Sequence, residues 1–346
     1  MAKKKKFSKQ QIRRIQSNRQ RKLQQKDKQF EQQLNDLSLG SAQKGRVISR
    51  FGQHADVEDE QGRVLRCDIR RTIDSLVTGD YVVWREKQAQ DDIPGVIEAV
   101  EERTSILKRP DFYDGLKPVA ANIDQVVILS SIAPELSLEI IDRYLIAVEN
   151  MGSQPVVLIN KSDLLSETER LKLDKTLDYY RQIGYQLDWL SVKSETGLQQ
   201  VETILQDKTS IVVGQSGVGK SSLVQALLPE QEIAVGEIDD IGLGKHTTTV
   251  AKLYHLKTGG ILIDSPGVRE FALWHLEPDQ VFDGFIEFSE IAAECKFRDC
   301  SHQNDPGCAL RAAAEQGKIL PSRLEHYHKI VRSNNENKPA YRLDAE

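Results

Sequence analysis

A glycine-rich stretch between a predicted strand and a predicted helix constrains this chain more than any other feature. The apolar run TSIVV ends at Val213, and Gly214 then opens the pattern G-x-x-x-x-G-K-S, which closes on Lys220 and Ser221. Glycines let the backbone wrap closely, so that successive N–H groups point inward at phosphate oxygens. The next residues, SLVQALL, predict a helix whose N-terminal dipole faces the anion. We interpret the stretch as a P-loop for a nucleoside triphosphate; the alternative is a glycine-rich turn.

The residues of this loop are expected to bind the nucleotide. Lys220 would reach the β- and γ-phosphates, and the Ser221 hydroxyl would ligate Mg²⁺. The full set expected to bind here is Gly214, Gln215, Ser216, Gly217, Val218, Gly219, Lys220, Ser221 and Ser222.

Strand-like and helix-like segments alternate from about residue 122 onward. Strands are expected at 122–131, 154–160, 185–192, 209–213, 250–256 and 260–267, and helices at 137–152, 167–184, 196–205 and 222–228. This alternation predicts a doubly wound α/β sheet, in which ligands bind at the carboxyl ends of the strands.

The tetrapeptide N-K-S-D follows the expected strand 154–160 directly and ends at Asp163. An ionised Asp accepts hydrogen bonds and cannot donate them. Guanine offers two adjacent donors, a pair that adenine lacks, so Asp163 is expected to select guanine. Asn160 and Lys161 would hold the base and the loop. The alternative is a helix N-cap at Ser162 or Asp163.

Two shorter motifs complete the expected nucleotide site. Ser191, Val192 and Lys193 resemble the S-A-K loop whose backbone touches the guanine oxygen. The pattern D-x-x-G runs from Asp264 to Gly267, after the apolar run GILI. Asp264 would hold Mg²⁺ through water, and the Gly267 N–H would sense the γ-phosphate.

The order of these motifs differs from that of ordinary GTPases, in which the P-loop comes first and N-K-x-D comes last. Here N-K-S-D begins at residue 160, the P-loop at 214 and D-x-x-G at 264. This order predicts a circularly permuted GTPase, because a permutation keeps the sheet and moves the termini. The segment after Asp264 then leads straight into the C-terminal domain, to which it would communicate the nucleotide state.

The segment GLGKHTTT, residues 242–249, lies between the P-loop and D-x-x-G. One of its three threonines is expected to complete the Mg²⁺ shell, and Thr248 is the candidate. Val268 follows D-x-x-G where many GTPases have a Gln that orients the attacking water, so slow hydrolysis by the free protein is expected. His246 is the candidate for positioning this water; the alternative is a loop histidine that touches RNA or nothing.

Three cysteines and a histidine form the pattern C-x4-C-x-H-x5-C: Cys295, Cys300, His302 and Cys308. Such a set gives a closed, tetrahedral, structural Zn²⁺ site with no position left for catalysis. The alternative is three reduced cysteines and a surface histidine. Zinc would stabilise a subdomain too small for a core of its own, by ~10 kcal/mol or more as in zinc-finger peptides.

Four short alternating runs precede the α/β pattern, at 45–51, 63–69, 80–85 and 95–100, and predict a small barrel of the OB type. Its arginines would bind RNA through phosphate contacts and stacking. The alternative is that they pair with Asp56, Glu58 and Asp59. Cys67 is expected in the barrel core. The arginines are Arg46, Arg50, Arg63, Arg66, Arg70, Arg71 and Arg85.

The N-terminal thirty residues are strongly basic, with twelve Lys or Arg and one acid. That segment carries +11, so the remaining 316 residues carry −16 to reach the total of −5. A basic arm on an acidic body indicates a polyanionic partner, and the alternative is a solvated tail or a localisation signal. The arm is rich in Gln, Arg and Lys, which predicts disorder or a marginal helix.

Composition excludes several classes of protein. No apolar run approaches the ~18 residues of a membrane span, and the N-terminus lacks the apolar region of a secretory signal. Three of the four cysteines cluster, unlike a disulfide framework. We therefore expect a cytoplasmic protein without a membrane partner. We also expect it to be a monomer.

The expected fold is multidomain α/β with five parts. They are a basic arm at 1–40, an OB-fold RNA-binding domain at 41–110, a circularly permuted GTPase domain at 111–276, an α-rich zinc-binding domain at 277–335 and a tail at 336–346.

These motifs, in this order, resemble the ribosome small-subunit-dependent GTPase family (RsgA, also called YjeQ), from about residue 41 to 330. The resemblance implies a late maturation factor of the bacterial 30S subunit that binds near the decoding region of 16S rRNA. It also implies hydrolysis of GTP to GDP, stimulated by the subunit, and a place among other assembly factors.

Two other classes of function stay open on the residues alone. A P-loop kinase would need an acceptor-binding lid and would leave N-K-S-D unexplained. An RNA-binding protein could hold a purely structural nucleotide, but Lys220, Ser221 and Asp264 argue against an inactive site. Measured turnover separates these classes.

Overall fold

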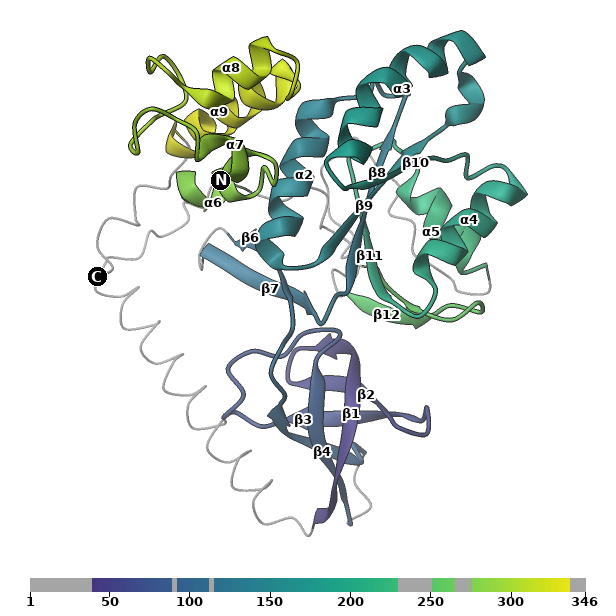
Figure 1. Ribbon diagram of the computed structural model, residues 1–346. Coiled ribbons are helices and arrows are strands. Elements are labelled where there is room, and N and C mark those ends of the chain that lie inside the picture. The colour runs from purple at the N-terminus through teal and green to yellow at the C-terminus, as the bar shows by residue number, and fades with distance from the viewer. Residues whose placement is uncertain are drawn as a thin grey trace, which may run out of the picture. The chain divides into compact units, whose positions relative to one another are not determined.

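The computed structural model describes residues 39–88, 92–111, 115–229, 251–264, 273 and 276–336. They divide into two compact units (Figure 1). One unit holds the described residues up to Leu76 together with Tyr81–Glu102, and the other holds Val77–Asp80 and those from Arg103 onward. Within the described ranges, no helix has the length and apolarity needed to cross a membrane.

The first unit is a closed five-stranded barrel. Its strands are β1 (Leu39–Phe51), β2 (His54–Asp59), β3 (Val64–Ile69), β4 (Tyr81–Lys87) and β5 (Gly95–Val100). β1 pairs antiparallel with both β2 and β4, β2 pairs with β3, and β5 closes the barrel by pairing parallel with β3 and antiparallel with β4. Alternate residues fill the interior, among them Val47, Val57, Cys67, Trp84 and Ile97.

The expected barrel and the buried position of Cys67 are confirmed, and β2 is an additional strand. β2 escaped the sequence pattern because Ala55 and Val57 are its only apolar residues, between acidic neighbours that face outward.

A two-stranded antiparallel sheet begins the second unit. It pairs β6 (Ile106–Asp111) with β7 (Gly115–Ala121), and neither strand was expected from the sequence.

A six-stranded sheet forms the centre of the second unit. It consists of β8 (Gln125–Ser131), β9 (Gln154–Asn160), β10 (Gln186–Trp189), β11 (Thr209–Val213), β12 (Lys252–His255) and β13 (Ile261–Asp264), in the order β10-β9-β8-β11-β13-β12. All neighbours are parallel except β12, which is antiparallel to β13.

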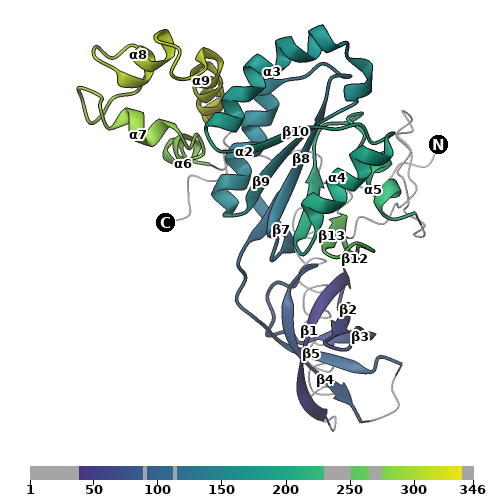
Figure 2. The same cartoon turned by 45° about the vertical axis from the view of Figure 1, so that its right-hand side comes forward.

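Helices cover both faces of this sheet. They are α2 (Leu138–Met151), α3 (Glu167–Gln182), α4 (Glu195–Leu205) and α5 (Lys220–Leu227). α2 and α3 lie on one side and α4 and α5 on the other (Figures 1 and 2). Along the chain, β8, β9 and β10 are added one beside the other toward one edge of the sheet. The next strand, β11, then pairs with the opposite side of β8. The switch point of this α/β sheet therefore lies between β8 and β11, where ligands bind.

Local signals fix the ends of these helices. Ser137 caps α2 and accepts a hydrogen bond from the Ile140 N–H, and Gly152 ends the helix in the left-handed conformation. Ser166 and Glu169 form a capping box at the start of α3.

Among the described residues, four helices follow the sheet: α6 (Pro278–Asp283), α7 (Phe288–Ala292), α8 (Ala309–Glu315) and α9 (Pro321–Glu336). They share a core in which Phe285, Phe288 and Tyr327 pack together with Ile146 of α2. These helices share the core with α2, so the expectation of a subdomain too small for a core of its own stays a prediction. Aromatic side chains from α6, α7 and α9 supply the buried surface that the metal motif alone did not indicate.

Candidate nucleotide-binding site and metal centre

The P-loop lies where the sequence placed it, between β11 and α5. Lys220 is the first residue of α5, and its Nζ donates hydrogen bonds to the carbonyl oxygens of Gly214, at 2.6 Å, and Gln215, at 2.5 Å. The ammonium group thus lies over the loop, where phosphate oxygens would compete with these carbonyl oxygens for its N–H donors. Ser221 and Ser222 are exposed in the first turn of α5, with Ser216 and Gly217 exposed in the loop.

Asn160 joins the N-K-S-D motif to the two other expected motifs. Its side chain is buried at the end of β9. Its Nδ2 donates to the carbonyl oxygen of Val218 in the P-loop, at 2.8 Å, and its Oδ1 accepts from the N–H of Val192, at 3.2 Å. One amide therefore joins the loop between β11 and α5 to the S-V-K loop.

Gly219 allows this arrangement. It has a φ of +103°, and a Cβ atom placed on it would lie 2.4 Å from Nδ2 of Asn160. Only glycine fits both the left-handed backbone and the close approach.

Lys161 ties the same loops from outside. It has a φ of +61°, and its Nζ donates to the carbonyl oxygen of Gly217, at 2.8 Å, and to that of Ala133, just beyond β8. Ala133 was missed from the sequence because it contributes a backbone carbonyl, for which no residue pattern exists.

Asp163 presents an exposed carboxylate beside the S-V-K loop. The Ser191 hydroxyl donates to its Oδ1 at 2.7 Å. This hydrogen bond, followed by the charges of Lys193 and Lys161, holds the pKa of Asp163 below its ordinary value. Ser162 anchors the loop through its N–H, which donates to the carbonyl oxygen of Leu190 at 3.0 Å. The carboxylate of Asp163 is thus an oriented, ionised hydrogen-bond acceptor.

The helix N-cap alternative for Ser162 or Asp163 is wrong. The cap of α3 is Ser166, and the short 3-10 helix Ser162–Leu164 has no side-chain cap.

Asp264 ends β13, which is the parallel neighbour of β11, so that both strands deliver their carboxyl ends to the same edge. Its carboxyl is half-buried, burial raises its pKa, and it has no hydrogen-bond partner among the described residues. Carboxylate and hydroxyl oxygens are the hard ligands that Mg²⁺ prefers, so Asp264 with Ser221 fits a divalent cation. Three expected residues, His246, Thr248 and Gly267, lie outside the described residues.

The four expected metal ligands come together in one cluster. The ligand atoms of Cys295, Cys300, His302 and Cys308 all lie within 4.8 Å of one another. Nδ1 of His302 is 3.7 Å from Sγ of Cys295 and 3.6 Å from Sγ of Cys308. Tetrahedral zinc with Zn–S of ~2.3 Å and Zn–N of ~2.0 Å requires sulfur–nitrogen separations of roughly 3.5 Å. The residues therefore fit a Zn²⁺ ion, and the alternative of a surface histidine is wrong, because His302 is buried.

Comparison with known proteins decides the family. The family model "RsgA GTPase" matches residues 100–274. The small ribosomal subunit biogenesis GTPase RsgA of Yersinia enterocolitica is 55% identical over 349 residues, which cover 99% of each chain. RsgA 1 of Vibrio vulnificus is 54% identical over 341 residues, covering 98% of this chain and 96% of its own. The chain belongs to the RsgA family.

Solved structures of two RsgA-like proteins agree in fold. YloQ, described as a circularly permuted GTPase, is 30% identical with a TM-score of 0.69, over 87% of this chain and 98% of its own. YjeQ from Thermotoga maritima is 31% identical with a TM-score of 0.69, over 86% of this chain and all of its own. The resemblance drawn from the motifs and their order is confirmed.

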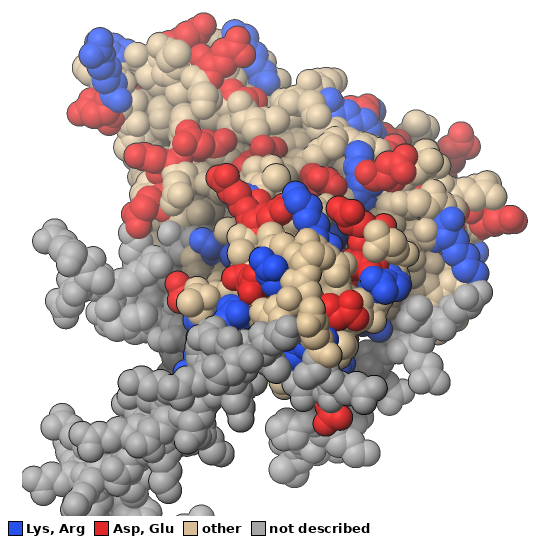
Figure 3. Space-filling view, turned by 90° about the horizontal axis from the view of Figure 1, so that it is seen from below, with Lys and Arg blue, Asp and Glu red and all other residues tan. Residues whose placement is uncertain are grey.

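Several barrel arginines of this RsgA-family chain pair with acids, and others contact a backbone carbonyl or an aromatic ring. Arg63 pairs with Asp59 at 2.7 Å and Arg66 with Asp56 at 2.9 Å, so the ion-pairing alternative is confirmed for these two. Arg70 and Arg85 share Glu98, Arg50 donates to the carbonyl of Leu76, and Arg46 stacks on Tyr81. On the face seen in Figure 3, Lys and Arg are interspersed with Asp and Glu over the described residues that are visible. RNA binding by the barrel stays a prediction.

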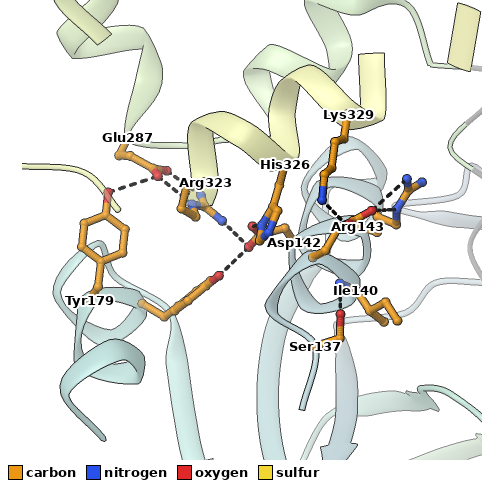
Figure 4. A network of polar contacts seen from close by, with 11 residues as sticks. Ser137, Ile140, Asp142, Arg143, Tyr179, Glu287, Arg323, His326 and Lys329 are labelled. Carbon is orange, nitrogen blue, oxygen red and sulfur yellow. Dashed lines mark hydrogen bonds and ion pairs between the residues drawn. The ribbon is translucent and has the colours of Figure 1, made fainter. Parts of the chain in front are cut away.

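A buried polar network joins α2 and α3 to the C-terminal helices (Figure 4). Arg323 of α9 donates to Asp142 of α2 at 2.8 Å and to both oxygens of Glu287 at 2.7 and 2.6 Å. His326 and Tyr180 also contact Asp142, at 2.6 and 2.8 Å. No sequence motif indicated this network.

Proposed function

We propose that this chain hydrolyses GTP to GDP and phosphate, binds the small (30S) ribosomal subunit, acts in its late maturation and is stimulated by it. One observation carries the nucleotide part: the Asn160 amide bonds the P-loop on one side and the S-V-K loop on the other. Curated relatives with the name small ribosomal subunit biogenesis GTPase, at about 55% identity over nearly the full chain, support the ribosomal part.

Guanine selection is assigned to Asp163. The carboxylate is held ionised and oriented by Ser191, and an ionised carboxylate accepts the two adjacent donors of guanine. Asn160, Lys161 and Ser162 hold this loop, and the S-V-K loop (Ser191, Val192 and Lys193) borders the base.

Phosphate binding is assigned to the P-loop, Gly214 to Ser222, with Lys220 on the β- and γ-phosphates. Ser221, Asp264 and Thr248 are proposed to hold Mg²⁺, which supplies charge neutralisation at the phosphates when bound. Gly267 is proposed to sense the γ-phosphate, and His246 to position the attacking water.

One structural Zn²⁺ is proposed at Cys295, Cys300, His302 and Cys308. The tetrahedral spacing of these atoms supports the assignment, and four protein ligands leave zinc no open position for chemistry.

The RNA-facing parts are proposed to be the basic arm 1–40 and the barrel of 41–110, taken as an OB-fold, with 16S rRNA as the ligand. Phosphates would compete with Asp56 and Asp59 for Arg66 and Arg63, because these arginines are half-exposed at the barrel surface. We further propose a cytoplasmic monomer that acts beside other assembly factors, with a GTPase domain at 111–276 and a zinc domain at 277–335.

Hydrolysis of GTP and of ATP with and without purified 30S subunits tests the whole proposal. We expect GTP alone to be hydrolysed, slowly by the free protein and much faster with subunits. Equal hydrolysis of ATP would refute the role of Asp163, and turnover indifferent to 30S subunits would refute the ribosomal role. Full stimulated turnover by His246→Ala with normal GTP binding would refute the role of His246.

Asp163→Asn isolates base recognition. The amide can donate where the carboxylate can only accept, so GTP should bind ~10–100-fold more weakly, whereas XTP, with a carbonyl in place of the exocyclic amine, should bind better than to wild type. Unchanged GTP affinity in this variant would show that another group reads the base.

A further inference from the structure

Four residues between β3 and β4 belong to the nucleotide-binding unit although the chain on both sides belongs to the barrel. The chain leaves the barrel after Leu76 and rejoins it at Tyr81, where β4 begins. The segment Val77–Asp80 is therefore joined to barrel residues at both of its ends, by peptide bonds to Leu76 and to Tyr81. A movement of the barrel strands would reach the segment through these two bonds.

Thr78 fixes this segment to the start of β12. Its side chain is buried, and its Oγ1 donates to the carbonyl oxygen of Ala251 at 2.8 Å. Its backbone forms a parallel bridge with Ala120. Ala251 immediately precedes Lys252, whose register partner across the β12–β13 pair is Asp264.

Gly79 brings the segment against the strand that carries Asp264. It has a φ of +91°, and a Cβ atom on it would lie 2.3 Å from the carbonyl oxygen of Ala121 and 3.3 Å from Cδ1 of Ile263. Ile263 directly precedes Asp264, so the segment borders both strands of the pair at their Asp264 end.

Buried hydrogen bonds hold the segment Val77–Asp80 in place. Asp80 is fully buried and accepts from Nε and Nη2 of Arg103, at 2.6 and 2.8 Å, and from the N–H of Val77 at 2.7 Å. Asn122 donates to the carbonyl oxygen of Gly79 at 3.0 Å. A segment with this many buried bonds moves with the sheet rather than as a free linker.

We propose that Thr78 is a positioning residue for Asp264: it fixes the start of β12 through Ala251, so that Val77–Asp80 couples the barrel to the Mg²⁺ end of the nucleotide site. The expected effect on stimulation by 30S subunits rests on the proposed function. The expected effect on Mg²⁺-dependent binding rests on the geometry of β12, β13 and this segment alone.

Thr78→Val tests this, because it keeps the β-branched shape and removes the hydroxyl. The first measurement is the dissociation constant of a non-hydrolysable GTP analogue in EDTA divided by that in Mg²⁺. We call this ratio the Mg²⁺ factor. We expect this factor to fall by ~3–10-fold, the effect of one lost hydrogen bond of this kind. The second readout is the ratio of turnover with 30S subunits to turnover without them, which should fall. Binding in EDTA should stay within about twofold.

Ser153→Ala is the matched control, because its buried hydroxyl also donates to a backbone carbonyl, that of Ile123, at 2.8 Å, away from β12. It should destabilise the chain similarly and change neither readout. Thr78→Ser should behave as wild type, and Thr78→Ala should repeat the loss if Thr78→Val does not fold. Equal Mg²⁺ factors in the Thr78 variants and Ser153→Ala would overturn the proposal. If subunits do not stimulate the wild-type chain, the proposed function fails, and the Mg²⁺ factor still decides on Thr78.

Discussion

Arg323 and Asp142 lie 181 residues apart in the chain and form an ion pair of 2.8 Å in which both side chains are fully buried. Glu287 supplies the second carboxylate, and the Arg323 guanidinium stacks on Phe285 at 4.6 Å. Desolvated charges are tolerated when they are paired and fully hydrogen-bonded. The pair therefore joins α9 to α2 through buried charges that each have a partner.

Removal of this guanidinium should be costly. Arg323→Met leaves Asp142 and Glu287 buried without a cation, and we expect the free energy of unfolding to fall by about 3–5 kcal/mol. Lys329→Met on the same helix is the control, because its 3.3 Å pair with Glu139 is exposed and should contribute about 0–1 kcal/mol. Urea unfolding followed by circular dichroism measures both. Equal losses would mean that the buried pair contributes no more than a surface pair.

Gly219→Ala should damage base selectivity as well as phosphate binding. The new Cβ would push Nδ2 of Asn160 away from Val218 and release the S-V-K loop. We expect GTP affinity to fall at least ~10-fold, from about 1–2 kcal/mol of left-handed strain plus the clash, and the preference for GTP over ATP to shrink.

Gly184→Ala controls for backbone strain alone, because its φ is +110° and a Cβ would meet nothing within 4 Å. It should lower stability and leave nucleotide binding unchanged. A Gly219→Ala chain that binds GTP and ATP more weakly by the same factor would argue that Asn160 does not move.

Two glutamates of α2 should respond to pH with opposite sign. Burial raises the pKa of Glu149 above its ordinary 4.5. Because the folded state then binds this proton more tightly, its stabilising effect is present below pH 4.5 and is lost as pH rises through the raised pKa. Glu149→Gln should therefore raise the free energy of unfolding near pH 7, with an advantage that disappears toward pH 4.5.

Burial also acts on Glu139, but hydrogen bonds and charges from Lys329 and Arg143 outweigh it and lower its pKa below 4.5. Its stabilising effect is present above 4.5 and is lost as pH falls through the lowered pKa. Glu139→Gln should therefore be less stable than wild type near pH 7. Urea midpoints across this pH range test both variants, and the same sign for the two would contradict these assignments.

Loss of one thiolate should release zinc without unfolding the rest of the chain. In Cys295→Ser we expect well under one Zn²⁺ per chain and a lower melting temperature, because Sγ of Cys295 also accepts the N–H of Ala309 at the start of α8. Cys67→Ala, in the barrel core, should keep about one Zn²⁺. Metal analysis and calorimetry measure both effects; full zinc content in Cys295→Ser would remove Cys295 from the ligand set.

Buried, locally signalled elements were predictable from the sequence. β9 spans Gln154–Asn160 as expected, because it is apolar on both faces and ends at a motif. α2 has its caps at Ser137 and Gly152 as the residues indicate. Asn160, Asp163 and Lys220 also lie at strand or helix ends, where an α/β sheet must put its ligand groups.

Elements without a local signal were not predictable. β2 has few apolar residues, and the carbonyl of Ala133 has no side-chain pattern. The pairing of Arg323 with Asp142 depends on how α9 packs on α2. No single stretch of the sequence carries this information, because the two residues are 181 positions apart.

The permuted order of the motifs also determines the order in which they are synthesised. Asp163 precedes Asp264 by 101 residues, which is roughly 5–20 s of translation. β8, β9 and β10 are made before β11, the neighbour of β8, and β13, the neighbour of β11, is made last of the six strands. The N-K-S-D loop at the end of β9 is therefore made before the P-loop after β11 and before Asp264 at the end of β13. The four GTPase motifs are thus complete in the nascent chain only once Gly267 has been added.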